Sequence, residues 1–231
     1  MAKIALEGSL PSLSLTHIVR TPRTAETPQA PLLILLHGVG SNERDLFGLE
    51  PALDPRFLIV SARAPLPMGP GAYGWYPVEF LPGGGFRIDP AAQEASRQML
   101  AGFVDEMITE HGADPARVHL LGFSQGAMMT LALALTHPEK VAGFVAMSGR
   151  LLPEVTRRAR PREELARLEG LVIHGTLDPV VPVAHGRETH QVLDELNVRH
   201  EYREYPMGHH VSEESLADVT GWLTRRLDAA A

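Results

Sequence analysis

A chain of 231 residues, of which 44% are hydrophobic and 21% charged, is typical of a globular domain with a buried core. Its formal net charge of -7 argues against a nucleic-acid-binding protein, which would usually present a basic face. Because the chain contains no cysteine, disulfides, thiolate metal sites and cysteine nucleophiles are all excluded.

The first third of the chain predicts short strands rather than a membrane segment. Residues 1–15 lack the apolar core of a signal peptide, and the longest aliphatic run, residues 32–36, is too short to cross a bilayer. We therefore expect a cytoplasmic protein without a membrane span. Residues 31–36 and 57–60 predict strands buried on both faces of a sheet, and residues 13–20 predict an antiparallel strand at its edge.

Residues 65–90 interrupt this pattern, because nearly half of them are Gly or Pro. A loop of this length in a compact domain is usually functional, so we predict that it flanks a pocket. Trp75, Tyr73 and Phe80 are the predicted substrate-binding residues within it. The alternative is a rigid surface loop whose aromatic side chains only attach it to the core.

The rest of the chain alternates between helices and strands. Residues 91–111 predict a helix, with an apolar residue at every fourth position from Ala95 to Met107. Strands are predicted at residues 118–122, 141–147, 171–173 and 200–205, and helices at residues 127–136, 183–196 and 213–227. This alternation predicts an α/β fold, with a mostly parallel sheet and helices on both faces. We expect residues 1–231 to form a single domain, and the arginine-rich residues 150–168 to form a solvated connection.

The pentapeptide GFSQG at residues 122–126 has the Gly-x-Ser-x-Gly pattern of a nucleophile elbow, and it lies between a predicted strand and a predicted helix. So sharp a turn puts the serine backbone in an unfavourable conformation, and its neighbours must be small for strand and helix to approach. Ser124 is therefore the predicted nucleophile. The backbone N–H of Gln125 is a predicted oxyanion donor. The alternative is a glycine-rich turn with an incidental serine.

A nucleophilic serine needs a base, and the base needs a partner that fixes its tautomer. Asp178 follows the strand at residues 171–173, and His209 follows the strand at residues 200–205. Both are thus expected beside Ser124 at the carboxyl edge of the parallel sheet, where sites in such folds gather. The order Ser, Asp, His is that of α/β-hydrolases. Two alternatives remain, in which His210 is the base or Asp178 only stabilises a turn.

A second oxyanion donor is expected in the loop that follows the strand at residues 31–36. That loop begins HGVG, and the N–H of Val39 is the predicted donor, with a plain glycine turn as the alternative. His37 and His174 each precede a glycine after a strand, so we expect them to anchor loops through hydrogen bonds. The eleven histidines show no metal-binding spacing such as HExxH, and we expect no metal and no cofactor.

Five segments together resemble the phospholipase/carboxylesterase family of α/β-hydrolases, which includes acyl-protein thioesterases: LLHGVGSNERDLF, SARAP, LLGFSQGAMM, HGTLDPVVP and PMGHHVSEES. The resemblance implies an α/β-hydrolase fold and a serine carboxylesterase that hydrolyses small to medium acyl esters or thioesters through an acyl-enzyme. It implies Ser124, Asp178 and His209 as the triad, and Val39 and Gln125 as oxyanion donors. The loop HGVGSNERD is closer to bacterial carboxylesterases than to the HGLGD of eukaryotic thioesterase-like members.

Two other functions are possible on this scaffold. The first is a peptidase or a lactone hydrolase, although such peptidases generally carry an additional domain and dienelactone-type hydrolases usually have a cysteine nucleophile. The second is a non-catalytic ligand-binding relative, because a fold does not fix a function. A relative of that kind usually lacks one residue of the triad, whereas this chain has all three.

Overall fold

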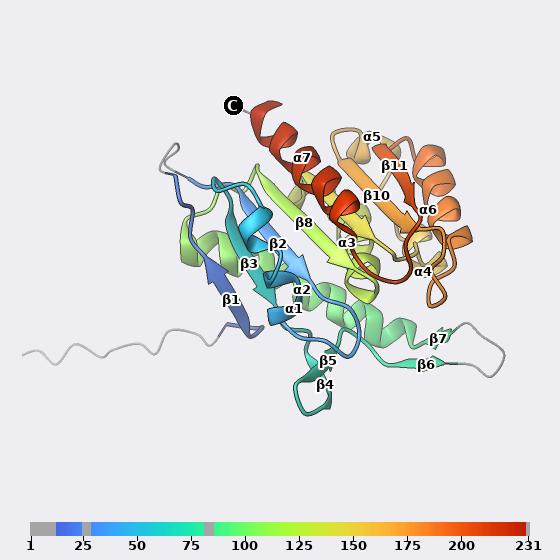
Figure 1. Ribbon diagram of the computed structural model, residues 1–231. Helices are drawn as coiled ribbons and strands as arrows, with labels where there is room; N and C mark the ends of the chain where they lie inside the picture. The colour runs from blue at the N-terminus through green and yellow to red at the C-terminus, as the bar shows by residue number, and fades with distance from the viewer. Residues whose placement is uncertain (1–12, 25–28, 81–85, 230–231) are drawn as a thin grey trace, which may run out of the picture.

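A seven-stranded sheet runs through the molecule in the order β1-β3-β2-β8-β9-β10-β11 (Figure 1). This computed structural model describes residues 13–24, 29–80 and 86–229. The strands are β1 (His17–Arg20), β2 (Leu32–Leu36), β3 (Leu58–Ala62), β8 (Val118–Phe123), β9 (Gly143–Met147), β10 (Glu169–Gly175) and β11 (Arg199–Tyr205). All neighbouring pairs are parallel except β1, which is antiparallel to β3. The predicted α/β fold and its antiparallel edge strand are confirmed.

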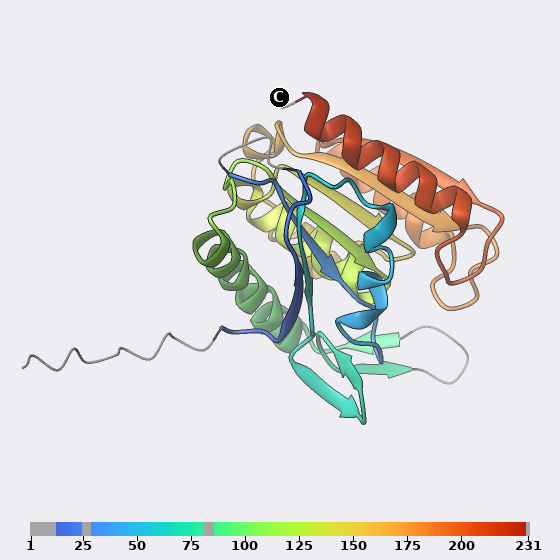
Figure 2. The same ribbon diagram turned by 60° about the vertical axis from the view of Figure 1, so that its left-hand side comes forward.

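The central strands are mostly apolar because both faces of the sheet are covered. In β2, alternate side chains enter two different cores: Ile34 packs on one face and Leu35 on the other. Helices α2 (Pro90–His111), α3 (Gln125–Thr136) and α6 (Ala184–Glu195) contribute to the first core, and α1 (Arg44–Phe47) and α7 (Glu213–Ala229) to the second. Figure 2 shows α2 and α7 on opposite sides of the sheet. Two short 3-10 helices cover residues Glu50–Ala52 and Pro138–Lys140.

Helix α2 exists as predicted, but its buried face differs from the predicted one. Of the predicted apolar repeat, Phe103 and Met107 are fully buried, but Ala95 and Met99 are exposed, and Leu100 is buried in their place. The reason is geometric: a helix has 3.6 residues per turn, so a strict repeat of four drifts away from the buried face. Among the described residues, no helix is apolar over a length that would cross a membrane.

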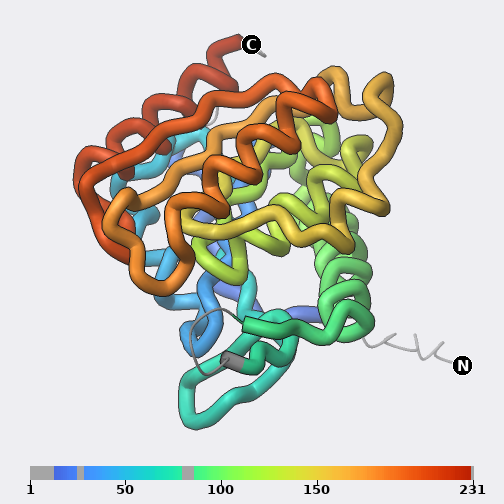
Figure 3. The backbone as a smooth tube through the Cα atoms, turned by 90° about the vertical axis from the view of Figure 1, so that its right-hand side faces the viewer, coloured from blue at the N-terminus to red at the C-terminus, as the bar shows by residue number. Residues whose placement is uncertain are grey.

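The Gly/Pro-rich segment contains two hairpins rather than one irregular loop. The first joins β4 (Leu66–Gly69) to β5 (Ala72–Gly74), and the second joins β6 (Val78–Phe80) to β7 (Phe86–Ile88). Figure 3 views the sheet from its β11 edge and shows both hairpins together at one end of the molecule. A bridge between Tyr73 and Ser41, which follows β2, attaches the first hairpin near the carboxyl end of that strand.

The arginine-rich residues 150–168 are not simply a solvated connection, so that prediction was wrong for the apolar side chains in this segment. They form two single-turn helices, α4 (Pro153–Thr156) and α5 (Arg162–Leu165). Four of their apolar side chains are buried in the core: Leu152, Val155, Leu165 and Leu168. The arginines between them are mostly exposed, and Arg158 pairs with Glu94 on α2 at 2.7 Å. The apolar residues thus fix the segment against α3 while its charges remain in solvent.

Candidate active site

Ser124 lies at the turn between β8 and α3 with a left-handed φ of 54° and a ψ of -116°. A non-glycine residue adopts such a conformation only when its surroundings impose it. The two flanking glycines allow the close approach that imposes it. A Cβ atom on Gly122 would lie 2.3 Å from the carbonyl oxygen of Gly126, and one on Gly126 would lie 1.9 Å from that of Leu36. The expected elbow geometry is therefore present.

Three side chains from separate loops form a continuous hydrogen-bonded line at this turn. The Nε2 atom of His209 lies 2.9 Å from the Oγ of Ser124, and its Nδ1 atom lies 2.7 Å from an oxygen of Asp178. With Nδ1–H donating to the carboxylate, Nε2 is left to accept the hydrogen bond of the serine hydroxyl. This is the arrangement in which an imidazole can take a proton from a serine.

Asp178 has donors on both carboxylate oxygens. One oxygen accepts from His209, and the other accepts from the backbone N–H groups of Val180 and Val181, each at 2.9 Å. The side chain is 0% exposed, so its negative charge depends on these donors. Asp178 therefore also stabilises its own turn, as the alternative prediction proposed, through its second carboxylate oxygen.

Of the two neighbouring histidines, His209 is the one that reaches the serine. Its ring packs against that of Phe123, with centroids 4.8 Å apart, and its side chain is 16% exposed. His210 is exposed, and its backbone N–H bonds to Gly208 in a tight turn. Gly208 allows this turn, in which the side chains of His209 and His210 point in different directions.

Two further histidines anchor the loops around the site, as expected. His37 lies 2.7 Å from the carbonyl oxygen of Gly38 through Nδ1, and its Nε2 accepts from the N–H of Ala64 at 3.0 Å. His174 lies 2.7 Å from the carbonyl oxygen of Val181 through Nε2. Burial is the main cause that lowers the pKa of both rings, so both are neutral at pH 7.

The two predicted oxyanion donors border the same pocket as Ser124. Val39 and Gln125 both line it. Within the described residues, neither backbone N–H donates a hydrogen bond to another protein group. Unused donors beside a nucleophile are what a developing oxyanion requires, and the N-terminus of α3 adds a favourable dipole.

The pocket beside Ser124 is almost wholly apolar. Its other walls are Tyr76, Val78, Phe86, Met128, Val180 and Val181. The hydroxyl of Tyr76 contacts the sulfur of Met128 at 3.2 Å. A lining of this kind suits the hydrocarbon part of an acyl group.

Among the described side chains, the aromatic residues that line the pocket are Tyr76 and Phe86, whereas Trp75 and Tyr73 do not line it. Trp75 is 1% exposed behind the pocket, where its indole N–H donates to the carbonyl oxygen of His37 at 2.9 Å. The guanidinium of Arg63 covers the ring of Tyr73, with its central carbon 4.6 Å from the centre of that ring. Phe80 ends β6, but its side chain is outside the described residues. Both Trp75 and Tyr76 lie in the bend after β5 and are buried in the core, but only Tyr76 also borders the pocket.

The side chain of Gln125 has a role that the sequence analysis missed. Its Oε1 atom accepts from the N–H of Trp75 at 2.7 Å, and its Nε2 atom donates to the carbonyl oxygen of Tyr76 at 2.8 Å. A buried side-chain amide therefore ties the elbow to the segment that supplies the pocket wall. The only sequence signal is a polar residue at the first position of an otherwise apolar helix.

Arg150 supports the other aromatic wall. Its guanidinium lies 4.0 Å from the ring centre of Phe86, which places a cation over an aromatic face. Burial lowers the pKa of Arg150, although the group stays charged at neutral pH. In the described part of the chain it forms no salt bridge, so the stacking contact is its main specific interaction.

Comparison with known proteins places this geometry in context. The family model described as Phospholipase/Carboxylesterase matches residues 20–226. Carboxylesterase SOBER1 of Arabidopsis thaliana is 30% identical over 66% of this chain and 68% of its own. Acyl-protein thioesterase 1 of Gibberella zeae is 29% identical over 69% of this chain and 71% of its own. Among solved structures, esterase PE8 is 28% identical with a TM-score of 0.78, covering 91% of this chain and 98% of that one.

Proposed function

Because the chain belongs to the phospholipase/carboxylesterase family and is a hydrolase of carboxylic esters or thioesters, we propose that Ser124 is its nucleophile, His209 its base and Asp178 the partner of that base. The observation that carries this assignment is the hydrogen-bonded line from Ser124 through His209 to Asp178, at the edge of an apolar pocket.

In the proposed reaction, the Oγ of Ser124 attacks the acyl carbonyl while His209 takes its proton at Nε2. The negative charge on the carbonyl oxygen is stabilised by the N–H groups of Val39 and Gln125. His209 then gives the proton to the leaving alcohol or thiol, and an acyl-enzyme remains. Water, activated by the same imidazole, clears the acyl group and restores the free serine.

The substrate class we propose is a small to medium acyl ester or thioester. An apolar pocket favours a hydrocarbon acyl chain, and its short, enclosed lining between Tyr76 and Phe86 favours a chain of limited length. Trp75 and Tyr73 act indirectly in this proposal, by holding the segment that carries Tyr76. We further propose that the chain works as one domain in the cytoplasm.

The central test measures hydrolysis of p-nitrophenyl acetate and p-nitrophenyl butyrate by the wild type and by Ser124→Ala. We expect the variant to lose at least about 10³-fold in kcat, because a nucleophile has no substitute in this mechanism. Ser61→Ala is the matched control, since Ser61 is also buried but its hydroxyl has no partner among the described residues. Equal rates for wild type and Ser124→Ala would end the proposal.

A fluorophosphonate probe separates catalysis from mere binding. It should label the wild type once and fail to label Ser124→Ala. A peptidase activity is tested by comparing an amide and an ester that share one acyl group. Faster turnover of the amide would favour the peptidase alternative over the esterase.

A further inference from the structure

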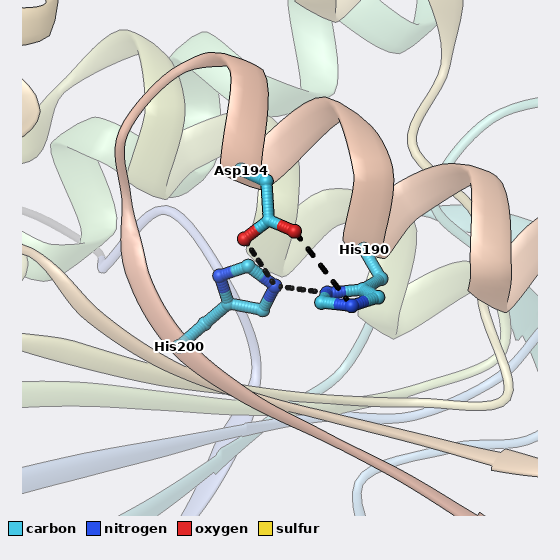
Figure 4. A group of neighbouring side chains, drawn as sticks. All are labelled: His190, Asp194 and His200. Carbon is cyan, nitrogen blue, oxygen red and sulfur yellow. Dashed lines mark hydrogen bonds and ion pairs between the residues drawn. The ribbon is translucent and has the colours of Figure 1, made fainter.

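Three potential metal ligands converge far from Ser124. His190 and Asp194 lie four residues apart on one face of α6, and His200 faces them from β11 (Figure 4). Nδ1 of His190 lies 2.7 Å from Nε2 of His200. One carboxylate oxygen of Asp194 lies 3.7 Å from Nε2 of His190, and the other lies 4.0 Å from Nε2 of His200. Among the described residues, this is the one group of three such side chains.

The backbone holds this group in place before any ligand arrives. Helix α6 ends in a Schellman motif, in which the N–H of Val198 bonds to Leu193 and the N–H of Asn197 bonds to Asp194. Asn197 has a left-handed φ of 58°, which asparagine tolerates well. The spacing between the helix end and the start of β11 is therefore fixed.

His200 is oriented as metal-binding histidines usually are. Its Nδ1 atom lies 2.8 Å from the carbonyl oxygen of Val198, so Nδ1 carries the proton and the lone pair of Nε2 points at Nδ1 of His190, where an ion would replace the hydrogen bond between the two rings. The side chain is 1% exposed, and its ring cannot turn away. The ring of His190 is stacked on that of Tyr202, with centroids 5.0 Å apart and 9° between the planes.

The charges of the group also favour a cation. In the described part of the chain, Asp194 contacts no Lys or Arg, and the two imidazoles are its ion-pair partners. Its carboxylate therefore offers a negative charge that no permanent cation neutralises. Two imidazole nitrogens and one carboxylate oxygen form a borderline-soft donor set, which suits Zn²⁺ better than Ca²⁺ or Mg²⁺.

Only small movements are needed to fit an ion. Two nitrogens bound to one tetrahedral Zn²⁺ are about 3.3 Å apart, given Zn–N bonds of about 2.0–2.1 Å. The two rings, now 2.7 Å apart at their nearest nitrogens, would separate slightly. The side chains of His190 and Asp194 are 41% and 63% exposed, so they can adjust while His200 stays fixed.

We propose that His190, Asp194 and His200 bind one divalent transition-metal ion, for which Zn²⁺ is the best match, with water completing the coordination. The ion links the end of α6 to the start of β11. The site lies at the opposite end of β11 from His209, about 17 Å of strand away, so it stabilises the fold without entering the reaction. This proposal departs from the expectation of no metal, which rested on the absence of an HExxH spacing and of cysteine and did not consider a ligand from a neighbouring strand.

The test uses protein without a polyhistidine tag, stripped with a chelator and dialysed. Calorimetric titration with ZnCl₂ should give one saturable site per chain, and Co²⁺ should give the visible absorption of tetrahedral coordination. At Zn²⁺ about 100 times the dissociation constant, the melting temperature should rise by about 5–10 °C.

His190→Gln, at an exposed position that leaves the fold intact, should weaken Zn²⁺ binding by at least about 100-fold, more than loss of an outer-shell partner. His200→Gln should do the same, and His185→Gln, on the same helix but outside the group, should bind normally. Binding to His190→Gln as tight as to the wild type would overturn the proposal and leave a simple His190–His200 hydrogen bond. The rate of ester hydrolysis should be equal with and without Zn²⁺. The metal-site proposal and the catalytic proposal can therefore fail independently of each other.

Discussion

Two groups of histidine and aspartate lie at opposite ends of the unit formed by β10, α6 and β11, and their geometries differ. At the carboxyl end of the strands, His209 lies between Asp178 and Ser124, with one partner on each ring nitrogen. At the other end, His190 and His200 contact each other directly, and Asp194 lies against both rings.

We infer that the placement of the ring nitrogens, and not the residue types, separates the roles proposed for the two groups. In the first group each ring nitrogen has a separate partner, so a proton can enter at Nε2 while Nδ1 stays bound to a carboxylate. In the second group Nε2 of His200 lies close to both Nδ1 of His190 and a carboxylate oxygen of Asp194. A linear arrangement favours proton transfer, and a convergent one favours a shared cation.

The largest expected effect separates the two aspartates. Asp178→Asn should lower kcat by about 10⁴-fold, because an amide facing Nδ1 favours the wrong imidazole tautomer. Asp194→Asn is the matched control and should leave kcat within about twofold, since the second group takes no part in hydrolysis. Steady-state kinetics with p-nitrophenyl butyrate measures both. Comparable losses in the two variants would erase the distinction between the groups.

A smaller effect is expected at the glutamine that joins the first group to its pocket. Gln125→Ala leaves the buried N–H of Trp75 and the carbonyl oxygen of Tyr76 without partners. The free energy of unfolding should fall by about 2 kcal/mol and kcat/KM by about 10-fold. Gln191→Ala, on α6 beside the second group, removes only an exposed contact with Glu195 and should change neither. Urea unfolding and ester kinetics supply the two measurements.

A histidine outside both groups should govern sensitivity to mild acid. Burial lowers the pKa of His119 to about 4. Its folded-state pKa is thus below the unfolded value of about 6.5, so the unfolded chain takes up the proton first and stability is lost as pH falls from about 6.5 towards 4. Between pH 7 and pH 5 this amounts to about 2 kcal/mol.

Urea unfolding at the two pH values tests this prediction. His119→Gln should flatten the dependence, whereas His111→Gln, at an exposed helix end, should keep it. His37 and His174, whose pKa values burial also lowers, should contribute further loss in the same direction. A stability that stays constant from pH 7 to pH 5 would contradict the neutral state assigned to these buried rings.

The smallest effect concerns the outer wall of the pocket. Arg150→Met removes the cation from the face of Phe86 and should raise KM about threefold with kcat unchanged, equivalent to about 0.5–1 kcal/mol. Arg158→Met, which removes a half-exposed ion pair with Glu94, is the matched control and should alter neither constant. An unchanged KM in Arg150→Met would show that the β6–β7 hairpin positions Phe86 without the contact from Arg150.

The sequence predicted the first group well because each of its residues follows a strong local signal. Ser124 lies in a motif whose glycines are required by contact distances of about 2 Å. Asp178 follows the buried strand β10 and His209 follows β11, and parallel strands bring their carboxyl ends together. Strand order and chain order together were enough to place these side chains at one edge.

The pocket wall and the second group were harder to predict, for two physical reasons. Trp75 and Tyr76 lie in the bend between β5 and β6, so which of them borders the pocket depends on the path of that bend and not on a regular alternation of side chains. His200 approaches His190 only because α6 ends in a Schellman turn of fixed length. Neither the path of the bend at Trp75 and Tyr76 nor the turn at the end of α6 leaves a pattern in the composition or spacing of the sequence.

The strand order has a practical consequence. Strands β1 to β9 of the main sheet form one contiguous block, and β10 and β11 lie beyond β9 in both sequence and space. A chain break between α4 and α5 would leave Ser124 in one fragment, and Asp178 and His209 in the other. Two such halves, fused to a pair of interacting proteins, would regain esterase activity only when brought together, which makes this scaffold suitable for a split-enzyme reporter.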